Sequence, residues 1–242
     1  MPVAAIAGLV FFVAFSLVLG GRMFLLARRE RSLPELALAV AFVFSGGIAA
    51  GFQAVVPLEL GPPWLQRHAF AVVRAGMDVG IACQMLFTWR VFRPRERWAA
   101  GIFGGTLVLL AALLAGYAWA GELANPLYRG PWFWAEVPVH VLGLGWGAGE
   151  ALAYWARMRR RLRLGMADPV VTNRFLLWGV AIGAGVVALA LPPLFAAFGQ
   201  GGHAVLPGLT ACVALVSLVG YALTFFPPRA YRRFVTRRAA SS

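Results

Sequence analysis

The chain has 242 residues, of which 61% are hydrophobic and 13% are charged. Soluble domains average roughly 45–50% apolar and about 25% charged residues, so an ordinary soluble domain of this length is excluded. The composition instead predicts an all-α integral membrane protein. The net charge is +13, and all 22 basic residues are arginine. Because the sequence contains no lysine, a retinal Schiff base and other lysine-dependent chemistry are also excluded.

Seven apolar stretches are long enough to cross a bilayer, which takes about 20 helical residues. They cover residues 3–26, 34–56, 66–90, 97–120, 132–156, 172–197 and 204–226. The connections between them are too short for a soluble domain. We therefore predict one seven-helix transmembrane domain over residues 1–226. A basic tail over residues 227–242 follows, which forms either a short amphipathic helix on the membrane or a disordered segment.

Several boundaries carry residues that favour the start of a helix. The run from Ser32 to Glu35 fits a capping box with a proline in the first turn. Asp168 followed by Pro169 offers an N-cap and a proline at the first helical position, and Pro131 opens the fifth span in the same way. The pair Pro192-Pro193 predicts a kink or break near the end of the sixth span.

The positions of the arginines predict the orientation. All of them except Arg67, Arg74 and Arg129 fall in the connections after the first, third and fifth spans, in the span ends that border these connections, or in the tail. Arginine-rich connections stay in the cytoplasm, so the N-terminus is predicted outside and the C-terminus in the cytoplasm. The same distribution explains the charge without nucleic acid and predicts contact with anionic lipid headgroups. We expect a bacterial cytoplasmic (inner) membrane.

Ionisable side chains within predicted spans are costly in lipid and are therefore candidates for a functional site. Arg74 and Asp78 lie four residues apart in the third span, and we expect them to pair on one helix face. In the fifth span, Glu136, His140 and Glu150 follow one helical stripe together with Gly143, Gly147 and Tyr154. This stripe is expected to face protein rather than lipid.

These residues predict a polar cavity that opens outward and has the Arg74–Asp78 pair as its floor. Other polar groups in the outer half add to it, and the expected ligand-binding residues are Arg74, Asp78, His140, Glu136, Gln53 and Tyr117, with His68 and Thr210 nearby. The alternative is a purely structural Arg74–Asp78 pair that holds the third span to its neighbours.

The preferred interpretation is a receptor or sensor that binds a small molecule in this cavity and involves no catalysis. In topology the chain resembles seven-helix receptors and microbial rhodopsins, but it carries no receptor signature motif and no lysine for retinal. Fold analogy does not by itself transfer function. A receptor would pass its signal to a cytoplasmic or membrane protein partner through the inner connections.

The second interpretation is an intramembrane metal-dependent hydrolase. Glu136 and His140 are four residues apart and offer two ligands on one face, and Asp78, His68 or His203 would complete the set. The metal candidates are thus His140, Glu136 and His68, with zinc as the expected ion and no other cofactor expected. The third interpretation is a proton-coupled transporter that relays protons through Asp78, His140 and Glu150, and the fourth is a structural subunit of a membrane complex.

Overall fold

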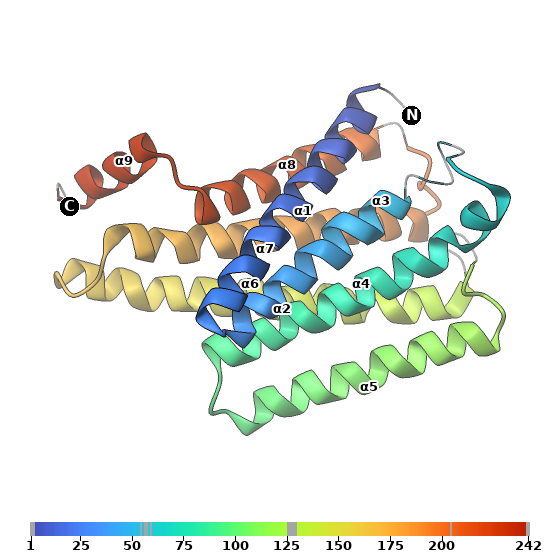
Figure 1. Cartoon of the computed structure of the whole chain (residues 1–242), viewed down its shortest axis with the longest axis horizontal. Helices are drawn as coiled ribbons and strands as arrows, with labels where there is room; N and C mark the ends of the chain where they lie inside the picture. The colour runs from blue at the N-terminus through green and yellow to red at the C-terminus, as the bar shows by residue number, and fades with distance from the viewer. Residues whose placement is uncertain are drawn as a thin grey trace. The chain divides into compact units, whose positions relative to one another are not determined.

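The computed structural model describes residues 3–53, 55, 58, 60–124, 130–203 and 205–240. Every regular element in these ranges is helical (Figure 1). The elements are α1 (Val3–Glu30), α2 (Leu33–Ala41), the π-helix η1 (Phe42–Ala49), α3 (Ala50–Gln53), α4 (Pro63–Phe92), α5 (Arg97–Trp119), α6 (Gly130–Arg163), α7 (Pro169–Ala197), α8 (Val205–Phe225) and α9 (Arg229–Ala240).

The chain forms two compact units, Met1–Gly143 and Leu144–Ser242. In the first unit, α1 packs against the continuous segment formed by α2, η1 and α3, and α4 packs against that segment and against α5 (Figure 1). In the second unit, α7 packs along α8, and α9 contacts α7. The candidate site described below belongs entirely to the first unit.

Six helical segments of the described chain are long and apolar enough to cross a membrane. They are α1, the α2–η1–α3 segment, α4, α5, α7 and α8. The chain is therefore compatible with a polytopic membrane protein. The fifth predicted span lies within α6, a helix of 34 residues whose apolar sequence is interrupted by polar and charged side chains. The seven-span count and the orientation remain predictions, and Arg129 lies outside the described residues.

The helix starts follow the chemistry seen in the sequence. Asp168 is the N-cap of α7, where its Oδ1 accepts a hydrogen bond from the backbone N–H of Val171 at 2.8 Å. Ser32 is the N-cap of α2, but its hydroxyl donates to the carboxylate of Glu35 instead of capping the backbone. Of the kink or break predicted at Pro192-Pro193, the break does not occur, because α7 continues through both prolines to Ala197.

The Asp168 cap leads to a first testable prediction. Replacing Asp168 with Ala removes the acceptor for Val171 N–H, and we expect the free energy of unfolding to fall by about 1 kcal/mol. Asp168→Asn keeps a side-chain oxygen and should stay close to wild type. Thermal unfolding of the purified chain in detergent measures both. Equal losses in the two variants would contradict a capping role.

The π-helix η1 was not predicted. It lies between α1 and α4 at positions where only glycine fits: a Cβ on Gly46 would lie 2.6 Å from the Cβ of Ser16 in α1. Similarly, a Cβ on Gly80 of α4 would lie 2.6 Å from the Cβ of Ser45 in η1. The wider turns of a π-helix are found mostly as short insertions in α-helices. In this chain η1 lies in close contact with α1 at Ser16 and with α4 at Gly80, two residues after Asp78.

Candidate metal centre

Three helices of the first unit supply a cluster of buried polar side chains. Helix α4 contributes Arg74 and Asp78, α5 contributes Tyr117, and α6 contributes Glu136 and His140. All five are buried, with exposed fractions from 1% for Tyr117 to 9% for Asp78. Because ionisable groups are seldom buried without partners, the contacts among these five residues determine what the cluster can do.

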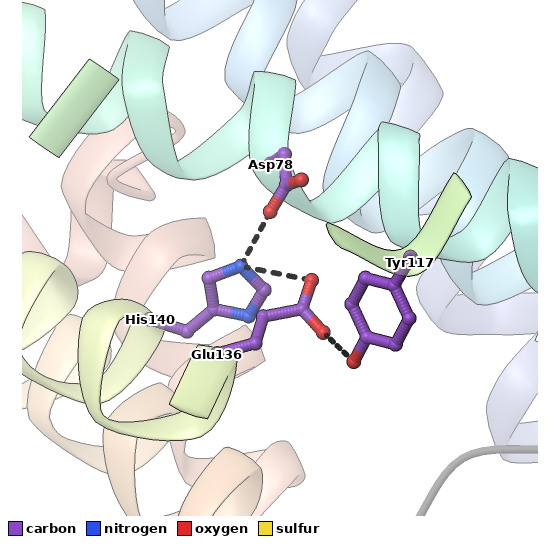
Figure 2. A network of polar contacts seen from close by, with 4 residues as sticks. All are labelled: Asp78, Tyr117, Glu136 and His140. Atoms are coloured by element: carbon purple, nitrogen blue, oxygen red, sulfur yellow. Dashed lines mark hydrogen bonds and ion pairs between the residues drawn. The ribbon is translucent and has the colours of Figure 1, made fainter. Parts of the chain in front are cut away.

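The imidazole of His140 is the centre of the cluster. Its Nε2 lies 2.8 Å from Oδ1 of Asp78 and 3.8 Å from Oε1 of Glu136 (Figure 2). With Asp78 ionised, its carboxylate can only accept, and Nε2–H of His140 is then the donor of this bond. The same nitrogen has no second proton for Glu136, and 3.8 Å is too long for a hydrogen bond. One ring nitrogen therefore faces two carboxylates, but its single N–H can donate a hydrogen bond to only one of them.

Tyr117 and Arg74 support this centre from the side of α5. The Tyr117 hydroxyl donates to Oε2 of Glu136 at 2.8 Å, which fixes the orientation of that carboxylate (Figure 2). The Arg74 guanidinium lies over the Tyr117 ring, 4.4 Å from its centroid, and donates through Nη1 to the carbonyl oxygen of Leu123 at 2.5 Å. Arg74 thus places a buried positive charge beside Tyr117, whose hydroxyl binds the Glu136 carboxylate.

The predicted ion pair between Arg74 and Asp78 is wrong. The two residues do share one face of α4, but Asp78 bonds to His140 of α6, whereas Arg74 turns to Tyr117 and to the Leu123 carbonyl. The i, i+4 spacing places two side chains near each other. It does not determine whether they pair with each other or with residues on other helices. The Arg74–Asp78 floor of the expected cavity is therefore replaced by an Asp78–His140–Glu136 centre.

Small residues fix the three helices on both sides of the centre. A Cβ on Gly116, next to Tyr117, would lie 2.5 Å from the ring of Trp132, one turn before Glu136. A Cβ on Gly143, three residues after His140, would lie 3.0 Å from Ile81 of α4. The close approach of α5 to α6 thus depends on Gly116, and the close approach of α4 to α6 depends on Gly143.

Pro138 lies between the two α6 residues of the cluster, and sequence reasoning missed it. A proline within a helix has no N–H for the carbonyl four residues earlier, and its ring crowds that carbonyl. Such positions recur in transmembrane helices where neighbouring groups compensate. The signal was present in the sequence, as a proline between a carboxylate and a histidine that are one turn apart.

The remaining predicted residues lie elsewhere. Gln53 is exposed at the last position of α3, and His68 is exposed in the first turns of α4. His203 lies before α8, where its ring contacts Phe195 and its Nδ1 accepts from Val205 N–H at 3.3 Å. Glu150 is buried in the second unit, near Trp146 of the same helix. His68 is therefore not a member of the metal-ligand group, and Asp78 completes it.

The stripe of α6 does face protein, as expected. Glu136, His140, Gly143, Gly147 and Glu150 are all buried. Tyr154, at its end, is half-buried and its ring contacts Phe175 at 4.4 Å between centroids.

Asp78, Glu136 and His140 have the donor atoms of a metal site. One ligand atom from each lies within 4.8 Å of the other two. Zinc bonds of about 2.0–2.1 Å in a tetrahedron place ligand atoms roughly 3.3 Å apart, between the 2.8 Å and 3.8 Å separations from His140 Nε2. The third separation, between the ligand oxygens of Asp78 and Glu136, lies within 4.8 Å, so these carboxylates must move relative to each other to form the site. The hydrogen bond from Tyr117 to Glu136 is the kind of outer contact that orients a ligating carboxylate.

Comparisons with protein-family models, with curated proteins and with solved structures find no match for the chain.

Proposed function

We propose that this membrane protein binds one divalent metal ion, of the zinc type, through Asp78, Glu136 and His140, and that it acts as a metal-dependent hydrolase. The observation that carries the proposal is the buried His140 nitrogen, which faces two carboxylates at 2.8 Å and 3.8 Å. A metal ion satisfies both carboxylates at once, whereas a single proton satisfies one.

The charges of the cluster support the same choice. With neutral His140, the two carboxylates and the Arg74 guanidinium leave a formal charge of about −1 in a buried region, which favours cation binding. Three protein ligands also leave a fourth position for water or substrate, as in hydrolytic zinc sites.

The receptor interpretation is less well supported by this geometry. Asp78, His140, Glu136 and Tyr117 use one another as partners. A small organic ligand would have to replace these contacts with contacts of its own. A metal ion would instead use the two carboxylates and the imidazole nitrogen, which already face one another.

Metal analysis of the purified chain tests the proposal. We expect the wild type, loaded with zinc and dialysed, to retain about one ion per chain. In His140→Ala we expect retention near background, because loss of one of three protein ligands removes most of the affinity. Tyr117→Phe keeps all three ligands but frees Glu136, and it should weaken binding by about 10- to 100-fold.

The chain provides matched controls for the histidine variant. His68→Ala and His203→Ala remove the exposed histidines of α4 and of the segment before α8, and both should retain zinc as the wild type does. If all three histidine variants retain equal amounts of zinc, the metal proposal is wrong. If zinc binds but the loaded wild type and His140→Ala hydrolyse ester and amide lipids equally, metal binding stands and the hydrolase function falls.

A second function, proton-coupled transport, is favoured by one observation. Two hydrogen bonds, Asp78–His140 and Tyr117–Glu136, lie in series across three helices, with 3.8 Å between His140 Nε2 and Glu136 Oε1 (Figure 2). Such carboxylate–histidine series can carry protons in membrane transporters. Proton flux into vesicles that Asp78→Asn abolishes, in protein free of metal, would favour transport over hydrolysis.

A further inference from the structure

The second unit has a groove between α9 and the first turn of α7, remote in sequence from the metal ligands. Its volume is about 510 Å³. It is lined by Val170, Arg229, Arg232, Arg233, Thr236 and Arg237. Four of the six lining residues are thus arginines, all of them on one short helix.

The arginines share one face of α9. Positions 229, 232, 233, 236 and 237 recur at the three- and four-residue spacing that places side chains on one side of a helix. Tyr231, Phe234 and Val235 fall on the opposite side. The helix is therefore amphipathic, with the groove on its cationic side, and Phe234 is 59% exposed.

No acidic side chain neutralises this face within the described residues. Arg229, Arg232, Arg233 and Arg237 are exposed, and none forms an ion pair there. The nearest acid in sequence, Asp168, uses an oxygen to cap Val171 N–H. The guanidinium donors around the groove are thus available to an anion.

A hydrogen bond holds α9 in place beside α7. The Asn173 amide of α7 donates to the hydroxyl of Tyr231, on the side of α9 opposite the arginine face. Burial raises the pKa of the Tyr231 hydroxyl, which therefore stays neutral and able to accept this bond. The backbone of α9 is accordingly held beside α7 before a ligand arrives.

We propose that this groove binds a phosphate group, carried by an anionic phospholipid or by a soluble phosphate compound. Guanidinium forks match phosphate oxygens through paired, charge-assisted hydrogen bonds, and several arginines around one groove supply them in number.

Binding to the full-length chain in detergent tests this site. The probes are phosphatidylglycerol in mixed micelles, phosphatidylcholine as the zwitterionic reference, and inorganic phosphate and pyrophosphate. Native mass spectrometry measures retained lipid, and calorimetry measures the soluble anions. We expect Arg232→Gln/Arg233→Gln to weaken binding of an anionic probe by about tenfold or more, since charge-assisted bonds are lost.

A double variant with the same loss of charge outside the groove is the control. Arg160→Gln/Arg161→Gln changes two exposed arginines at the end of α6, and it should alter binding by no more than about twofold. Arg229→Gln/Arg237→Gln provides a second groove variant. Groove-dependent binding of phosphatidylglycerol alone identifies a lipid source, and groove-dependent binding of inorganic phosphate or pyrophosphate identifies a soluble one. Equal losses in groove and control variants, or no binding of any anionic probe, would overturn the proposal.

Discussion

Replacing Arg74 with Met should cause the largest loss of stability of any single substitution in the cluster. The guanidinium is 2% exposed, donates to the Leu123 carbonyl and lies over the Tyr117 ring. Methionine keeps much of the length but removes the charge, so Asp78 and Glu136 lose their compensating cation. Removing one member of a buried charged set costs about 3–5 kcal/mol. Unfolding of the purified chain in detergent by heat or denaturant measures the loss.

Arg67→Met is the matched control, because it makes the same chemical change on the same helix. Arg67 is exposed, and exposed substitutions usually change stability by no more than about 0.5 kcal/mol. Similar losses in Arg67→Met and Arg74→Met would show that Arg74 does not compensate the carboxylates. If zinc restores part of the stability of Arg74→Met, the added positive charge of the metal has taken over part of the arginine's role.

The positions of the helices could be predicted from the sequence because their limits depend on local chemistry. Prolines and the Asp168 cap start helices, and glycine and arginine-rich connections separate long apolar runs. The π-helix η1 could not be predicted in this way. Its sequence is apolar and glycine-rich like that of its neighbours, and its close contacts with Ser16 in α1 and Gly80 in α4 involve other parts of the chain.

The sequence indicated which residues of the candidate site would lie near one another, but not which of them would form hydrogen bonds with each other. Arg74, Asp78, Tyr117, Glu136 and His140 were all expected near one another, since ionisable or polar groups in apolar helices need partners. Their pairing depends on which helices become neighbours and on their rotation. The local i, i+4 rule therefore favoured Arg74 with Asp78, whereas contact between α4 and α6 brought His140 to Asp78.

Gln53 and His68 were expected to line the same cavity, but the structure places them outside the cluster. Their depth along the predicted spans suggested the same polar region, but depth does not tell which side of a helix a residue occupies. Both side chains are exposed in the structure. Facing direction has to come from packing, and for α4 the buried side includes Arg74, Gly76, Asp78 and Gly80.

Gly116→Ala should damage the proposed metal centre without changing any of its three proposed ligands. The added Cβ would lie 2.5–2.7 Å from three ring atoms of Trp132, and an indole ring cannot shrink to admit it. Either α5 moves away from α6 or the ring rotates. Both changes disturb the adjacent bond between Tyr117 and Glu136. Overpacking of this kind costs about 1–3 kcal/mol, and we expect zinc affinity to fall about tenfold or more with the loss of carboxylate orientation.

Gly105→Ala isolates the clash from the general effect of the substitution. It lies on the same helix, and no atom lies within 4 Å of its added Cβ. Both variants gain the same helix propensity, about 1 kcal/mol, so the difference between their unfolding free energies reports the clash alone. The double variant Gly116→Ala/Trp132→Phe has a smaller ring and should recover part of both stability and zinc affinity.

If Gly116→Ala and Gly105→Ala behave alike, α5 is not held against α6 at Trp132. Stability loss with unchanged zinc affinity would instead show that the Tyr117–Glu136 bond does not position the carboxylate for a metal.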